Sequence, residues 1–306
     1  MRKALVVLLL VAIVGGAAFA AGRGESDQVT VGYTFHGAAD VFQNTLKNEF
    51  VAAAEELDME VNVIDPNLDT ALQIAAVETF ISQQVDVIAI SPLDSEALVP
   101  VCQDAIAAGI PVVAVNSELN MEDPMFSYVG SVNYEAGLIQ AEYMIDKIPE
   151  GGKVVYLEGT PGMEHSIARK EAVMDNLIDE RDDLELLASQ TADYRRDLGM
   201  SVMEDYIQAF PDLDAVIAAN DQMILGAIEA LKGAGRLEGV LTAGIDGTPG
   251  ARESIKAGEL TMSVVQDAVG QATEGAQVAL MMANGEGGGE RYIIPFYPID
   301  ASNPDE

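Results

Sequence analysis

Polar residues end several hydrophobic segments of this chain, where they could bind a small polar ligand. In VIAANDQMILGAIEAL (216–231), strand-forming residues stop at Asn220-Asp221 and a helical pattern begins at once. Amide side chains both donate and accept hydrogen bonds, so amides and a carboxylate suit a neutral ligand with many hydroxyl groups. The residues that end such segments are Thr34, Ser91, Asn116, Asn220, Asp246 and Gln266.

Helix capping is the alternative role for each of these residues taken alone. Asn, Asp and Ser commonly accept a hydrogen bond from the first turn of a helix. We expect Asp221 to cap the helix that begins at Met223, and Asn220 to face the ligand instead. Capping does not require amides at the ends of several strands, so the set as a whole favours ligand binding.

The elements that must position these residues alternate between strand-like and helix-like segments. This alternation predicts an α/β fold with parallel sheets, in which ligands bind outside the carboxyl ends of the strands. We expect strands at 29–35, 59–65, 85–91, 111–116, 126–130, 153–159, 184–190, 214–220, 240–246 and 260–266.

The second half of the chain repeats the pattern of the first half. VDVIAIS (85–91) corresponds to DAVIAAN (214–220), and IPVVAVN (110–116) corresponds to VLTAGID (240–246). This repetition predicts two lobes of similar topology, although all strand–helix–strand units resemble one another to some degree. Two lobes that face each other across a cleft would direct the polar residues of both toward one enclosed volume.

The sequence contains few signals of catalysis. It has no glycine-rich dinucleotide or phosphate loop and no serine elbow of the G-x-S-x-G type. Its two histidines, His36 and His165, fit no metal-binding spacing, and we expect them in loops or at the rim of a cleft. We therefore expect no catalytic residues, no metal and no cofactor.

The charge of the chain excludes one class of partner. It has 50 acidic and 16 basic residues, with a formal net charge of −34. Such a surface repels phosphate backbones and anionic membranes, so we expect no binding to nucleic acid.

The first residues, MRKALVVLLLVAIVGGAAFAAG, have the order of a signal peptide. A positive start, an apolar run and the small residues around Ala20 predict a leader over 1–21, cleaved near Ala20/Ala21, and export to the periplasm. A buried N-terminal helix is the alternative. The single cysteine, Cys102, has no internal disulfide partner, and we expect it to be buried and inert.

Four segments carry a resemblance to a known family. AISPLDSEALVP (89–100), AIAAGIPVVAVN (105–116), NDQMILGAIEALKGAG (220–235) and GIDGTPGARESIKAGELTMSVVQ (244–266) resemble the sugar-binding proteins of bacterial ABC importers. The similarity is to the ribose-binding branch of the type I periplasmic binding fold. It covers about residues 28–300.

The resemblance implies an α/β fold of two similar Rossmann-like lobes, with parallel sheets flanked by helices and a three-strand hinge. It places the N-terminal lobe at 27–131 plus 267–293 and the C-terminal lobe at 132–266 plus 294–306. The hinge strands are expected near Gly130–Asn133, Gln266–Ala268 and Ile293–Phe296.

The binding positions of the family carry over one by one. Ser117 stands where the family has an arginine, and Ile245 stands where it has an aromatic residue. The resemblance implies a ligand-binding set of Phe42, Gln43, Ser91, Asn116, Arg169, Tyr194, Asn220, Asp246 and Gln266.

The departures from the family affect the choice of ligand. An arginine–aspartate pair that grips sugar hydroxyls is replaced by the neutral pair Asn116-Ser117. We therefore expect a different monosaccharide, a polyol or a larger sugar in place of ribose.

The expected function is capture of a sugar-like ligand by hinge closure and its delivery to an ABC permease, by a monomer that performs no chemistry. A sensory protein that presents autoinducer-2, a polyol or a nucleoside to a chemoreceptor or sensor kinase is the main alternative. The ligand-sensing half of a lactose-repressor-type regulator is disfavoured, because a signal peptide stands where its DNA-binding helices should be. An enzyme on the same fold is the remaining class.

Overall fold

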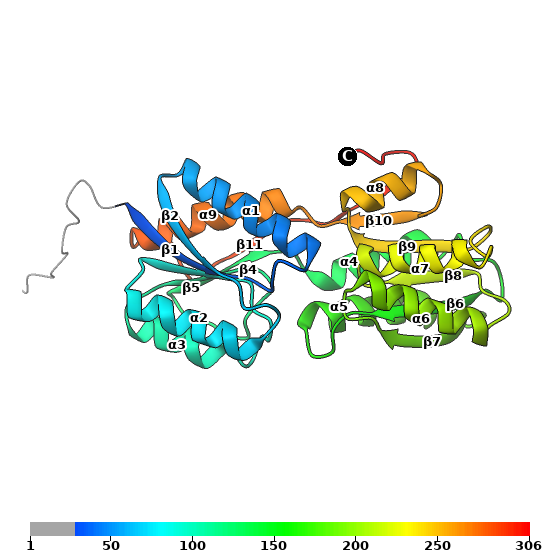
Figure 1. The fold of residues 1–306 in the computed structure, drawn as a ribbon, viewed down its shortest axis with the longest axis horizontal. Helices are drawn as coiled ribbons and strands as arrows, with labels where there is room; N and C mark the ends of the chain where they lie inside the picture. The colour runs from blue at the N-terminus through cyan, green and yellow to red at the C-terminus, as the bar shows by residue number, and fades with distance from the viewer. Residues whose placement is uncertain (1–27) are drawn as a thin grey trace, which may run out of the picture.

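The computed structural model describes residues 28–306, which form two lobes, each built on one sheet (Figure 1). The predicted signal peptide lies outside the described residues. None of the described helices is long and apolar enough to cross a membrane.

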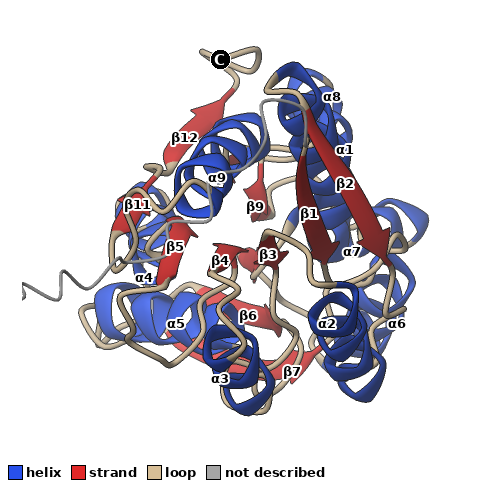
Figure 2. Cartoon of the chain, turned by 90° about the vertical axis from the view of Figure 1, so that its left-hand side faces the viewer, coloured by secondary structure: helices blue, strands red, loops and turns tan. Residues whose placement is uncertain are grey.

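The first lobe contains a six-stranded parallel sheet in the order β11-β5-β4-β3-β1-β2. Helices α1 and α9 cover one face, and α2 and α3 cover the other (Figures 1 and 2). The elements are β1 (Val29–Thr34), α1 (Val41–Glu56), β2 (Met59–Ile64), α2 (Thr70–Gln83), β3 (Val87–Ile90), α3 (Val99–Ala107), β4 (Val112–Asn116), β5 (Phe126–Gly130), α9 (Ala268–Ala283) and β11 (Arg291–Ile293).

The second lobe contains a six-stranded sheet in the order β12-β10-β9-β8-β6-β7. Helix α4 packs on α5, and α6 packs on α7. The elements are α4 (Asn133–Met144), β6 (Lys153–Glu158), α5 (Glu164–Val173), the π-helical turn η1 (Met174–Ile178), β7 (Glu185–Thr191), α6 (Arg196–Ala209), β8 (Ala215–Ala218), α7 (Asp221–Gly233), β9 (Leu241–Asp246), α8 (Pro249–Lys256), β10 (Met262–Val265) and β12 (Tyr297–Asp300).

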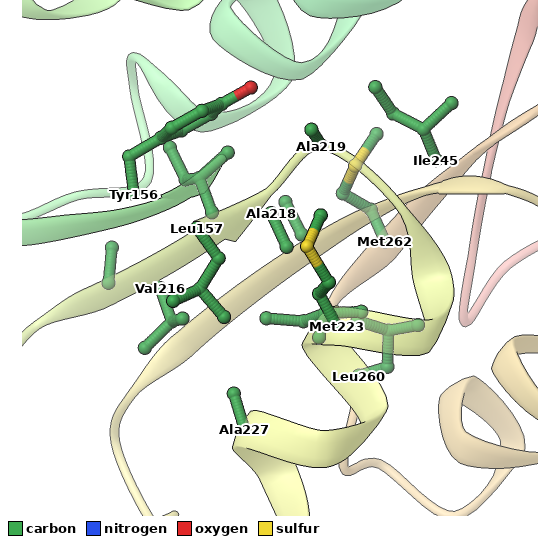
Figure 3. Packing of buried hydrophobic residues seen from close by; sticks show 14 of the residues in the cluster. Tyr156, Leu157, Val216, Ala218, Ala219, Met223, Ala227, Ile245, Leu260 and Met262 are labelled. Atoms are coloured by element: carbon green, nitrogen blue, oxygen red, sulfur yellow. The ribbon is translucent and has the colours of Figure 1, made fainter. Parts of the chain in front are cut away.

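The central strands are buried on both faces because helices cover both faces. Every residue of β3, β4 and β8 is buried, which matches their continuous runs of Val, Ile and Ala. In the second lobe, the hydrophobic core includes Val216 of β8, Met223 of α7 and Met262 of β10 (Figure 3). Cys102 is buried in the first lobe as expected, and burial raises the pKa of its thiol to about 12.

One edge strand, which the sequence analysis did not predict, differs from the other strands. β12 pairs antiparallel with β10. The chain returns to the second lobe directly from β11 through residues 294–296, with no helix between the strands. Because β11 is parallel to β5 and runs toward the cleft, the chain enters the second lobe from the cleft side, and β12 therefore runs opposite to β10.

Three short segments connect the lobes, namely residues 131–132, 266–267 and 294–296. They lie close to the three predicted hinge strands. The exact lobe boundaries, 27–131 plus 267–293 and 132–266 plus 294–306, stay a prediction.

Candidate ligand site between the lobes

A small cavity lies between the carboxyl ends of the two sheets. It contains residues of both lobes, and eight of the nine predicted site residues line it. We call it the inner cavity. Its lining residues are His36, Asp40, Phe42, Gln43, Asn116, His165, Arg169, Tyr194, Asn220, Asp246 and Gln266.

The first-lobe wall is held by the start of α1 and the end of β4. Asp40 caps α1 by accepting a hydrogen bond from the backbone N–H of Gln43 (3.0 Å), which sets Phe42 and Gln43 at the cavity. Gln43 Nε2 donates to Asn116 Oδ1 (2.7 Å), and Asn116 Nδ2 donates to Gln271 Oε1 (3.0 Å). The side-chain oxygen of Gln43 has no hydrogen-bond partner, although the residue is only 2% exposed. This wall therefore contains a residue whose acceptor oxygen no protein group uses.

The same hydrogen bonds continue to the connecting segments. Gln271 Nε2 donates to Ser131 Oγ (2.9 Å), and Ser131 Oγ donates to the carbonyl of Ile294 (2.6 Å). Ser131 and Ile294 belong to two of the three segments that join the lobes. A polar side chain of the cavity, Asn116, is thus connected through Gln271 to Ser131 in a connecting segment.

The second-lobe wall is organised around Arg169, which is 3% exposed. Its Nη1 donates to the carbonyl of Ala219 (2.8 Å), and its Nη2 donates to Gln266 Oε1 (3.0 Å). Nε and Nη2 also donate to Asn133 Oδ1 (3.3 and 3.2 Å), and Nη1 lies 3.8 Å from Asp246 Oδ1. Protein groups thus accept from four of the five N–H groups of this guanidinium.

The two histidines meet across the cleft. The ring centroids of His36 and His165 are 5.9 Å apart with planes 14° from parallel, and His165 lies 5.1 Å from the ring of Tyr194. His36 lies in the loop after β1, as expected, and both rings line the inner cavity. His36 is 3% exposed, and His165 lies on α5. Together with Tyr194 they form a column of flat rings that spans both lobes.

The cavity contains three residues that the predicted site lacks, and two of them carry a signal in the sequence. His165 stands four residues before Arg169, which places both on the same face of one helix. Asp40 stands two residues before Phe42, at the expected start of a helix. His36 has no comparable signal, because only the tertiary fold brings its loop to the opposite lobe.

The surroundings of the inner cavity shift the pKa values of its aspartate and histidine side chains. Burial raises the pKa of Asp246 well above its usual value, and the charges of Asp221 and Asp40 raise it further while Arg169 lowers it. Desolvation, Arg169 and His36 together hold the pKa of His165 well below 6.5. Desolvation also lowers the pKa of His36, although Asp40 opposes this effect. Both imidazoles are therefore neutral at pH 7.

Three cavity residues have left-handed backbone conformations, with φ values of 73° at Asn116, 58° at Tyr194 and 127° at Asp246. Non-glycine residues in this region are uncommon, and they concentrate at functional sites. The ring of Tyr194 also requires Gly159, because a Cβ there would lie 2.0 Å from its Cζ. The fold thus holds these residues in place at some cost in backbone energy.

Ser91 is the predicted site residue that the structure does not bring to the cavity. It is fully buried at the end of β3, and its carbonyl accepts from Gln73 Nε2 (2.9 Å). His36 Nε2 lies 3.1 Å from the carbonyl of the next residue, Pro92, so the imidazole forms the cavity wall near this strand end. Thr34 is likewise buried and does not line the cavity.

The prediction that Asp221 caps α7 is wrong. Asn220 caps α7, because its Oδ1 accepts from the backbone N–H of Met223 (3.0 Å), and it lines the cavity as well. Asp221 is the first helical residue and points inward. It accepts from Thr248 (2.7 and 3.0 Å) and from Ser263 Oγ (2.7 Å). Its carboxylate therefore ties α7 to β10 and to the start of α8.

The contact between His36 and Ser117 is not a catalytic pair. His36 Nε2 lies 3.1 Å from Ser117 Oγ and 3.1 Å from the carbonyl of Pro92. A carbonyl oxygen only accepts hydrogen bonds, so Nε2 carries the proton. This nitrogen cannot remove a proton from Ser117, as a general base would.

A wider groove continues from the inner cavity to the surface. It shares His36, Asp40 and Tyr194 with the inner cavity and has a volume of about 660 Å³. The inner cavity itself has a volume of only about 20 Å³, close to the space of a single water molecule. A ligand the size of a sugar therefore requires the lobes to separate or the lining side chains to rearrange.

Comparisons with known proteins agree with this architecture. Residues 31–287 match the periplasmic binding protein domain. The chain is 34% identical over 256 residues to the ribose import binding protein of Bacillus subtilis (strain 168). The aligned region covers 83% of this chain and 82% of that relative. It is also 31% identical over 263 residues to a xylitol-binding protein of Mycolicibacterium smegmatis, and this aligned region covers 86% of this chain and 74% of that relative.

A solved structure shows the same fold. The solute-binding protein of an ABC transporter from Bacillus halodurans C-125, with bound myo-inositol, has a TM-score of 0.87 and 34% identity. The match covers 92% of this chain and 98% of that chain. The chain belongs to the periplasmic binding proteins. Within them it is a type I sugar-binding protein of the branch that includes the ribose-binding proteins, which confirms the predicted fold class and resemblance.

Proposed function

We propose that this protein is exported and captures a sugar or polyol in the inner cavity by closure of its two lobes. The observation that carries this proposal is that amide, acid, arginine and ring side chains of both lobes converge on one cavity. A ligand that contacts both walls stabilises the closed arrangement, because only closure allows both sets of contacts. Relatives that bind ribose, xylitol and myo-inositol support this ligand class.

Titration calorimetry with ribose, allose, xylitol and myo-inositol tests the proposal. We expect at least one of these compounds, or a close analogue, to bind with a Kd below 1 mM. Asp246→Ala should weaken that binding, whereas Asp212→Ala should not, because Asp212 is a surface residue far from the cavity lining. The carbohydrate assignment fails if no sugar or polyol binds below millimolar concentration.

We further propose that the monomeric, closed complex delivers its ligand to an ABC permease and that the protein performs no chemistry on it. Uptake of labelled ligand should be lost when the gene is deleted, restored by the wild-type gene and not restored by the Asp246→Ala gene. Unchanged uptake together with a lost behavioural response to the ligand would instead indicate a sensory role.

A further inference from the structure

The inner cavity is lined by more carboxyl groups than cationic groups. Among the described residues that line it, Asp40 and Asp246 are carboxylates and Arg169 is the only arginine or lysine. Arg169 lies 3.8 Å from Asp246, which accounts for one carboxylate. Asp40 forms no ion pair within residues 28–306, and its charge acts on Asp246.

The two histidines do not supply the missing positive charge. Desolvation holds the pKa of His165 well below 6.5 and lowers that of His36, so both rings are neutral at pH 7. Further acids stand behind the cavity wall. Asp221 is buried beside Asp246, and Glu164 hydrogen-bonds Asn133 (2.8 Å).

The cavity also contains hydrogen-bond acceptors that a ligand could use. Four of the five N–H groups of Arg169 donate to Ala219, Asn133 and Gln266. The buried side-chain oxygen of Gln43 remains without a partner. The carboxyl groups of Asp40 and Asp246 and the side-chain oxygen of Gln43 thus line the cavity as acceptors, and an ammonium group supplies three donors and a positive charge.

We propose that the ligand is a sugar or cyclic polyol that carries a protonated amino group, which binds between Asp40 of the first lobe and Asp246 of the second. This inference rests on the proposed function and specifies its ligand class. A cation between the two carboxylates would attract both lobes at once. Closure would then depend on the amino group as well as on the hydroxyl groups.

Calorimetry at pH 7.5 with matched neutral and amino compounds tests this inference. The pairs are galactose with galactosamine, glucose with glucosamine, and myo-inositol with a mono-amino inositol. Within the pair that binds best, we expect the amine to bind about tenfold or more tightly than its hydroxyl parent. N-acetylation of the amine, which removes its charge, should abolish this preference.

Asp40→Asn is the informative variant, because Asn caps a helix as well as Asp does and α1 should still form. The preference for the amine should disappear in Asp40→Asn. Asp69→Asn is the matched control, because Asp69 caps α2 in the same manner and does not line the inner cavity. Asp69→Asn should retain the full preference.

The outcomes distinguish this inference from the proposed function. If neutral compounds bind as tightly as their amines, or if Asp40→Asn keeps the preference, the amino-ligand inference is wrong and the sugar-binding function stands. If neither neutral nor amino compounds bind, the proposed function itself fails, and the inference fails with it.

Discussion

Arg169 shows how much of this site depends on a single side chain. Its guanidinium connects the end of β8, through the carbonyl of Ala219, with residues at two of the connecting segments, Asn133 and Gln266. It also stands beside Asp246. A lysine could not replace it, because one ammonium group cannot serve acceptors in so many directions.

Arg169→Ala should weaken ligand binding by about 2–5 kcal/mol, because it leaves a buried carboxylate and several buried acceptors without their donor. Calorimetry on the purified variant measures the change. Lys232→Ala, which removes a surface cation paired with Glu259, is the control and should bind normally. Binding of Arg169→Ala within threefold of the wild type would contradict the proposed site.

The histidine pair predicts how ligand affinity depends on pH. Closure removes both rings from water, so their pKa values in the closed state lie below the usual 6.5. Above pH 6.5 the rings are neutral in the open and closed states, and the closed state keeps its full stability. As pH falls below 6.5, the open state takes up protons that the closed state does not, so closure weakens.

Affinity should therefore fall between pH 7.5 and pH 5, and His165→Phe should reduce this fall, because the phenyl ring can stack but cannot titrate. Asp246 has the opposite effect on the pH dependence of affinity. Burial raises its pKa, so protonation of this carboxyl group favours the closed state. A rise of affinity on acidification would mean that the carboxylate dominates and that the histidine argument is wrong. Calorimetric titrations of the wild type and His165→Phe with ligand between pH 5 and pH 7.5 test this prediction.

At the scale of elements, the packing of α4 on α5 positions Arg169. The two helices approach closely at Gly137, where a Cβ would lie 2.3 Å from the carbonyl oxygen of Arg169 and 2.8 Å from the Cβ of Ala172. The rigid backbone of α5 cannot move aside as a flexible side chain could. A larger residue at Gly137 must therefore push the two helices apart.

Gly137→Ala should lower the free energy of unfolding by about 1–3 kcal/mol through this overpacking, and it should also weaken ligand binding. Gly233→Ala is a matched control near the end of α7, where a new Cβ meets no atom within 4 Å. It should leave stability unchanged or raise it by up to about 1 kcal/mol. Urea denaturation compares the two variants, and equal stabilities would contradict the packing argument.

At the scale of the whole molecule, the small inner cavity implies that the lobes separate, or that the lining side chains rearrange, before a ligand enters. Its volume of about 20 Å³ is far below that of typical ligand sites, which reach about 300 Å³ or more. The three connecting segments permit such a motion with few changes in backbone angles.

We expect the radius of gyration, measured by small-angle X-ray scattering, to be larger without ligand than with saturating ligand. Asp246→Ala should show the larger value at the same ligand concentration. Identical scattering of the wild type with and without a bound ligand would contradict hinge closure.

The direction of a side chain at a strand end is the part of the site that the sequence does not predict. Hydrophobic periodicity located the ends of β3, β4 and β9, and a polar residue stands at each of these ends. Whether a residue at such an end reaches the cavity depends on the neighbouring loops. Asn116 and Asp246 reach it, whereas Ser91 is buried and does not line it.

The sequence by itself determined the alternation of strands and helices, the repetition of the lobes and most of the polar residues at the strand ends. Hydrophobic periodicity is a local property, and it survives in the sequence as a pattern of residue types. Tertiary structure alone decided that β12 runs antiparallel and that Asn220, not Asp221, caps α7. It also brought His36 against His165, because contacts between lobes depend on how the connecting segments orient two separate sheets.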